Sequence, residues 1–146
     1  MLTHLVAPRT CGRDWETFLE TMRAGPFRVG ARFTGGGPAP LPTSAAAAFE
    51  AFESSPVYLT IECGSVVAHC HFFEPSAEVR LDIDPREVTD ASRLESVLAL
   101  MRHVAAALGR PVRATPESYG PREDFERYDF LEVSPDGEAA MLRTDL

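Results

Sequence analysis

The sequence predicts an α+β domain in which helices pack mainly on one face of an antiparallel sheet. Apolar and polar residues alternate over residues 27–34 and 57–84, which is typical of half-buried strands. Residues 92–108 instead repeat their apolar side chains at helical spacing. The chain has 146 residues, a common size for one domain, and no internal repeat divides it. We therefore expect residues 1–146 to form a single domain.

The N-terminal part of that domain is expected to begin with a short flexible lead, followed by a helix over residues 14–24. Asp14 suits the N-cap of this helix, and Gly25 with Pro26 ends it. Its apolar residues share one helical face: Trp15, Phe18, Leu19 and Met22. A strand over residues 27–34 follows.

Residues 35–43 are rich in glycine and proline and predict a surface loop. Thr43 or Ser44 can cap the short alanine-rich helix expected over residues 44–53. A phosphate-binding role for the three glycines of the loop is disfavoured, because no lysine follows them.

Residues 57–84 predict a three-stranded antiparallel meander. Gly64-Ser65 suits a two-residue hairpin turn, because glycine accepts the positive φ that a type II′ turn needs. This turn sets the register of the first two strands. The apolar face then pairs Cys63 with Val66, Ile61 with Ala68, Leu59 with Cys70 and Val57 with Phe72, while the polar face pairs Thr60 with His69 and Tyr58 with His71.

The third strand of the meander places Val79, Leu81 and Ile83 on the apolar face. In the expected register, His69 lies beside Asp82 and His71 beside Arg80. The polar face of the meander, joined by Arg28 and Arg32 of the preceding strand, is therefore our candidate binding surface. Its predicted residues are Tyr58, Thr60, Glu62, His69, His71, Phe73, Arg80, Asp82 and Asp84.

The C-terminal half begins with the long helix over residues 92–108. Ser92 and Glu95 form a capping box in the sequence, and Gly109 with Pro111 ends the helix. Residues 111–118 are expected to add a strand, and residues 121–127 a charged turn or short helix. The chain closes with a hairpin over residues 128–144, which turns at residues 135–137 (Pro-Asp-Gly).

Charge and composition narrow the classes of function. The net charge of −8 repels phosphate backbones, so a basic protein partner is favoured over a nucleic acid. All fourteen basic residues are arginine, which excludes a P-loop lysine and a Schiff-base lysine within this chain. No cofactor-binding motif is present. The sequence leaves the oligomeric state open.

The cysteines and the chain's hydropathy favour a cytoplasmic protein. Three cysteines cannot all pair within one chain, and no C-x-x-C spacing occurs, which is typical of a reducing compartment. Neither a signal peptide nor an apolar run long enough to span a membrane is visible. Strand alternation predicts that Cys63 and Cys70 are core residues and leaves Cys11, in the lead, as the exposed thiol.

Two enzymatic alternatives use the histidines of the meander. His69 and His71 with Asp82, or with Glu62, can supply a two-histidine, one-carboxylate metal site. His69 can also act as a general base oriented by Asp82, but the sequence offers no nucleophile beyond the flat-strand Thr60. Catalysis is therefore less favoured than binding, and no catalytic residue is assigned.

One part of the sequence resembles a known class of proteins. The run His71-Phe72-Phe73, the segment 82–88 (Asp-Ile-Asp-Pro-Arg-Glu-Val), the helix, and the segment 108–118 (Leu-Gly-Arg-Pro-Val-Arg-Ala-Thr-Pro-Glu-Ser) are similar to small immunity proteins of bacterial polymorphic-toxin and contact-inhibition systems. The resemblance covers about a third of the chain and implies a compact, acidic, noncatalytic inhibitor of a cognate toxin. The leading hypothesis is therefore an immunity-type protein-binding domain, and the alternatives are a small hydrolase and a ligand-binding sensory module.

Overall fold

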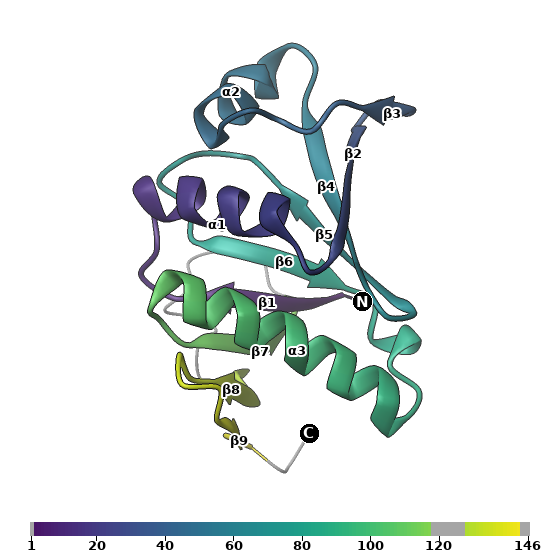
Figure 1. Ribbon diagram of the computed structural model, residues 1–146, viewed down its shortest axis with the longest axis vertical. Coiled ribbons are helices and arrows are strands. Elements are labelled where there is room, and N and C mark those ends of the chain that lie inside the picture. Colours follow the sequence, from purple (N-terminus) through teal and green to yellow (C-terminus); the bar gives the residue numbers. More distant parts are fainter. Residues whose placement is uncertain (1, 118–127, 144–146) are drawn as a thin grey trace.

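The computed structural model describes residues 2–117 and 128–143, and it confirms the α+β class. One antiparallel sheet of nine strands carries its helices on one face (Figure 1). The strands are β1 (Thr3–Ala7), β2 (Arg28–Phe33), β3 (Pro38–Ala39), β4 (Val57–Cys63), β5 (Val66–His71), β6 (Val79–Ile83), β7 (Val112–Pro116), β8 (Leu131–Val133) and β9 (Ala139–Met141). The helices are α1 (Arg13–Ala24), α2 (Ala45–Glu50) and α3 (Ala91–Leu108), with the 3-10 helices η1 (Ala51–Glu53) and η2 (Pro85–Glu87).

The order of strands across the sheet is β3-β2-β4-β5-β6-β1-β7-β8-β9. The predicted meander is present as β4, β5 and β6, and β2 pairs with its first strand. The predicted C-terminal hairpin forms β8 and β9, which continue the same sheet beyond β7. The residues expected as a charged turn, 121–127, lie outside the described part of the chain, as does the last residue of the predicted hairpin.

The N-terminal lead is the largest departure from expectation. Instead of a flexible segment, Thr3–Ala7 forms β1, which lies between β6 and β7 and pairs with both. All five of its residues are buried. This strand joins the meander to the C-terminal half of the sheet, so a segment expected to be peripheral holds the two halves together.

The main apolar core lies between the sheet and the helices α1 and α3, which cross the same face of it (Figure 1). Trp15 of α1 packs against the rings of Phe18, Phe49 and Phe72, and its indole N–H donates to the carbonyl of Ala77 at 2.8 Å. Alternation within each strand sends every second side chain into this core and its neighbours to the opposite, helix-free face. That helix-free face contains the candidate site.

The ends of the helices differ in part from the sequence expectation. The N-cap of α3 is Asp90, whose carboxylate accepts from the backbone N–H of Arg93 at 2.8 Å, so the Ser92–Glu95 capping box is wrong. Glu95 instead binds Arg102. Asp14 likewise does not cap α1, which begins after Gly12; the Asp14 carboxylate accepts from the N–H of Cys11 at 3.1 Å.

Other predicted helix ends are confirmed. Ser44 caps α2 by accepting from the N–H of Ala47 at 3.1 Å. Gly109 ends α3 with a left-handed conformation, φ 64°. Within the predicted glycine-rich loop, two residues form the short edge strand β3.

Candidate functional site

The register of the meander matches the prediction, and it determines which side chains share the helix-free face. Gly64 has φ 60°, as the predicted turn requires. The observed partners include Cys63 with Val66, Thr60 with His69 and Tyr58 with His71. His69 also opposes Asp82 of β6, as expected. Continuing this register by two residues places His71 beside Arg80.

Pairing with β1 extends the polar row of the meander across the sheet. Asp82 opposes His4 of β1, and His4 opposes Thr115 of β7. The row on the helix-free face therefore runs from Thr60 through His69, Asp82 and His4 to Thr115. His4 and Thr115 were not predicted for this face. Their positions depend on pairing of β1 with β6 and β7, strands that lie far from it in the sequence.

Asp82 was predicted to lie beside and orient His69, but its carboxylate pairs with His4. The Nδ1 atom of His4 lies 2.5 Å from Oδ1 of Asp82, and Nε of Arg80 lies 3.5 Å from the same oxygen. His4 is only 4% exposed. No hydrogen bond joins His69 to Asp82 among the described residues. Asp82 therefore does not orient His69, and the general-base interpretation of His69 loses its orienting carboxylate.

A second, partly buried ion cluster lies on the helix-free face beyond β1. Arg113 of β7 binds Glu132 of β8 at 2.7 Å and Asp129 at 3.4 Å. The hydrogen bond with Glu132 is the main cause that raises the pKa of the Arg113 guanidinium. Asp129 is 3% exposed and Thr115 is 1% exposed. The half of this face formed by β1, β7 and β8 is thus largely buried and internally paired.

The opposite half of the face carries a row of rings in contact with one another, which we call the aromatic ladder: Phe52, Tyr58, His69, His71 and Phe73. The His71 ring stacks on Tyr58, with ring centres 5.0 Å apart, and on Phe73 at 5.5 Å. Tyr58 also meets the His69 ring at 5.3 Å, and Phe52 of η1 meets Phe73 edge-on at 5.7 Å.

Three rings of the aromatic ladder are exposed, whereas Tyr58 and His71 between them are partly buried. Phe73 is 49% exposed and Phe52 is 40% exposed, and His69 is also exposed. Phe52 was not predicted for this surface. Phe49, three residues earlier, packs against Trp15 in the core. The two phenylalanines of this helical segment therefore point in different directions, Phe49 to the core and Phe52 to the aromatic ladder.

Burial and neighbouring cations determine the state of His71. Burial is the main cause that lowers its pKa; Asp82 opposes this effect, and the charges of His69 and Arg80 add to it. A neutral imidazole is therefore favoured at the centre of the aromatic ladder, where it stacks between Tyr58 and Phe73.

Strand β2 borders the aromatic ladder on one side. Arg32 opposes Tyr58, and Arg28 opposes Glu62. The Arg28–Glu62 pair is long, 3.9 Å, and both side chains are well exposed, so it contributes little to stability. Gly30 opposes Thr60, whose hydroxyl would lie 3.2 Å from a Cβ at this position. Arg28, Arg32 and Glu62 thus form a charged rim.

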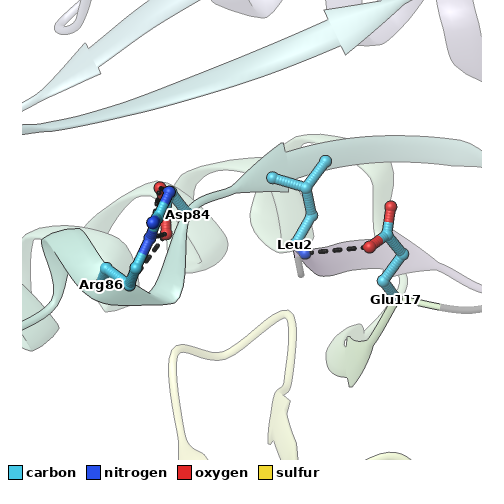
Figure 2. Close-up of polar contacts among 4 residues, drawn as sticks. All are labelled: Leu2, Asp84, Arg86 and Glu117. Carbon is cyan, nitrogen blue, oxygen red and sulfur yellow. Dashed lines mark hydrogen bonds and ion pairs between the residues drawn. The ribbon is translucent and has the colours of Figure 1, made fainter.

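Asp84 lies outside the aromatic ladder, at the end of β6. Figure 2 shows the Arg86 side chain folded against its carboxylate, with Nη2 at 2.8 Å from Oδ2. Hydrogen bonds from the Arg86 side chain and backbone N–H lower the pKa of Asp84 to about 2. Just before β1, the N–H of Leu2 donates to the Glu117 carboxylate at 3.1 Å (Figure 2). Asp84 is therefore engaged locally.

Several acidic side chains near this surface are engaged in contacts within the chain. Asp82 pairs with His4 and Arg80, Asp90 caps α3, and Glu78 accepts from the N–H of Arg9 at 2.6 Å. The charged groups that border the aromatic ladder are of both signs: Arg28, Arg32 and Glu62 on one side, and Arg80 and Asp82 of β6 on the other. The acidic character of the chain is thus a property of the whole molecule more than of this face.

The metal interpretation has no geometric support in residues 2–117 and 128–143. No three His, Cys, Asp or Glu side chains of this part of the chain are placed to hold a metal ion, so His69, His71 and Asp82 do not form a ligand set. Cys63 and Cys70 are core residues, as predicted; burial raises the pKa of the Cys63 thiol to about 11 and that of Cys70 still further. Cys11 is exposed.

Comparisons with protein-family models, curated proteins and solved structures gave no match. Across the described residues, no helix combines the length and the apolar character needed to cross a membrane. The function proposed for this chain therefore rests on the helix-free face of the sheet and its aromatic ladder.

Proposed function

We propose that this protein is a noncatalytic protein-binding domain and that the aromatic ladder is the centre of its binding surface. The observation that carries the proposal is the ladder's geometry: rings in contact in series, stacked at its centre, partly exposed, and borne mainly by paired strands of the sheet's helix-free face. Aromatic side chains dominate the energy of protein interfaces. A surface of this kind supplies such anchors without prior rearrangement.

Stacking favours binding because it orders the side chains before a partner arrives. A free tyrosine or phenylalanine loses rotamer entropy when it is immobilised in an interface. Here the His71 ring is held between Tyr58 and Phe73, and Phe52 closes the end of the row. The charged rim of Arg28, Arg32 and Glu62 borders this row. Charged groups at the edge of an interface orient the partner and disfavour wrong partners.

We further propose that the partner is a toxin domain and that the chain acts as an immunity-type inhibitor inside the producing cell. The sequence resemblance supports this narrower proposal, and so does the net charge of −8, which would speed association with a basic toxin. The aromatic ladder would then supply short-range contacts, while the acidic remainder of the molecule supplies long-range attraction.

The test uses the toxin domain encoded in the same locus. We expect Phe73→Ser and Tyr58→Ser each to weaken the affinity by about fivefold or more, since truncating a central aromatic anchor costs more than about 1 kcal/mol. The matched control is Phe33→Ser, which changes a phenylalanine of 36% exposure outside the aromatic ladder. Isothermal titration calorimetry measures the affinity, and survival of cells that co-express toxin and variant measures protection.

Three outcomes would contradict the proposal at different levels. An equal loss for Phe33→Ser and Phe73→Ser, or no loss for either ladder variant, would place the interface elsewhere. Normal binding without protection would remove the inhibitor role but keep the binding surface. A locus without any toxin gene would contradict the immunity proposal.

A further inference from the structure

The two edges of the sheet differ in how well they are protected from pairing with another strand. At one edge, β3 contains only Pro38 and Ala39, and Pro40 follows. Proline has no N–H to donate, so this edge cannot extend a ladder of hydrogen bonds. At the other edge, all three residues of β9 are exposed, and residues 139–142 contain neither proline nor a charge. Figure 1 shows β3 and β9 at opposite ends of the sheet.

The backbone of β9 has free hydrogen-bonding groups on its outer side. Leu142 N–H donates to the carbonyl of Phe130, and Ser134 N–H donates to the carbonyl of Glu138, both at 2.9 Å. Residues 138, 140 and 142 therefore bond inward to β8, because these directions alternate along an antiparallel strand. The N–H and C=O groups of Ala139 and Met141 point outward, and no strand of residues 2–117 or 128–143 pairs on that side.

Exposed apolar side chains gather at this same edge. Met141 is 61% exposed and opposes the core residue Leu131, so it lies on the helix-bearing side of the sheet. On α3, Leu94 is 44% exposed and begins a stripe that continues through Leu98 to Arg102 at four-residue spacing. Arg102 Nε donates to the carbonyl of Gly137, in the turn between β8 and β9, at 3.0 Å. This contact directs the apolar flank of α3 toward the β9 edge.

We propose that β9 pairs antiparallel with β9 of a second copy of this chain, around a two-fold axis at Met141. The two sheets then become continuous, and Met141 opposes its own copy in a hydrogen-bonded pair. The same register places the small Ala140 opposite the large Leu142. Neither Glu138 nor Arg143 faces its own copy, so no like charges oppose each other. Such self-complementarity is what a two-fold interface requires, and it favours a second copy over a foreign strand.

The flank of α3 completes this interface. A three-residue strand pair alone would bury little area. In the proposed two-fold arrangement, the exposed Leu94 and the partly buried Leu98 of α3 supply further apolar surface for contact with the second copy, in addition to Met141. The interface therefore combines outward backbone groups with apolar cover, and it is separate from the aromatic ladder across the sheet.

The first test measures mass in solution by sedimentation equilibrium over a range of concentrations. We expect a reversible dimer of the 16.0 kDa chain. Met141→Lys should shift it to monomer, and so should Met141→Pro, which removes an outward N–H without touching the bonds to β8. Pro40→Lys, at the opposite edge, should leave the dimer intact. Unchanged circular dichroism would show that each variant is folded.

The second test traps the register in a Cys11→Ser background, which removes the exposed native thiol. Cα atoms of a hydrogen-bonded antiparallel pair lie about 5.5 Å apart, within the range of about 4.4–6.8 Å that a disulfide spans. Met141→Cys should therefore form a disulfide-linked dimer with oxidised glutathione, and Pro40→Cys should not. A monomer at every concentration, a dimer that survives Met141→Lys, or equal crosslinking at both positions would overturn the proposal.

Discussion

On the β1–β7 half of the helix-free face, His4 and Thr115 are 4% and 1% exposed, whereas on the β4–β5 half Phe73 is 49% exposed and His69 is exposed. Both halves belong to one face of one sheet, and the same alternation brings polar side chains to each. They differ in their partners. His4 pairs with Asp82 and Arg113 pairs with Asp129, whereas the rings of the other half contact one another and stay at least partly exposed.

This difference separates a structural role from a functional one. A buried ion pair holds the strands that bear it, and removing one partner leaves a buried group without compensation. An exposed ring row contributes less to folding and remains free to contact another molecule. Polarity alone therefore does not identify a binding surface, and burial decides which half of the face is available.

The largest expected effect concerns the buried half. Asp82→Ala removes a carboxylate that accepts a hydrogen bond from His4 and pairs with Arg80, and we expect a loss of about 2–4 kcal/mol in the free energy of unfolding. Glu62→Ala is the matched control, because its pair with Arg28 is exposed; we expect a change within about 0.5 kcal/mol. Urea denaturation followed by circular dichroism measures both. Equal losses would erase the proposed distinction between the halves.

An intermediate effect is expected at two threonines of the same row. The hydroxyl of Thr115 is buried and finds no hydrogen-bond partner in the described structure, so Thr115→Val should raise the free energy of unfolding by about 1 kcal/mol. Thr60→Val, at the partly exposed end of the row, should change it by less than about 0.5 kcal/mol. The same denaturation experiment compares them. Destabilisation by Thr115→Val would show that its hydroxyl is satisfied.

The parts of this site that could be predicted from the sequence depend on local signals. Gly64-Ser65 determines the turn, the turn determines the register, and the register places Tyr58, His69 and His71 on one face, as observed. The Asp82 position followed because the apolar residues of β6 had to join the core.

The parts that could not be predicted depend on contacts between distant segments. Thr3–Ala7 has no turn beside it that ties it to a neighbouring strand, and its partners β6 and β7 lie over seventy residues away in the chain. A strand buried on both faces is usually apolar throughout, but β1 contains Thr3 and His4 beside three apolar residues. Its sequence therefore did not indicate that all five residues are buried. The missed pairing changed the assignment of Asp82 from His69 to His4. Phe52 was missed because helical spacing alone does not show that it turns away from Phe49.

The smallest expected effect concerns the pH dependence of the accessible half. Burial lowers the pKa of His71 from its ordinary value of 6.5, so the folded protein binds this proton less readily than the unfolded chain. The free energy of unfolding should then decrease as the pH falls through about 6.5, and level off below the lower pKa of the folded state.

His71→Tyr keeps an aromatic ring between Tyr58 and Phe73 but removes the titration. Its stability difference from the unmodified chain should therefore depend on pH between about 7.5 and 5, whereas Phe73→Tyr should show a constant difference. If the free energies of unfolding of His71→Tyr and the unmodified chain instead differed by a constant amount across this pH range, the His71 imidazole would be as well solvated in the folded protein as in the unfolded chain. The aromatic ladder would then not be a partly desolvated surface.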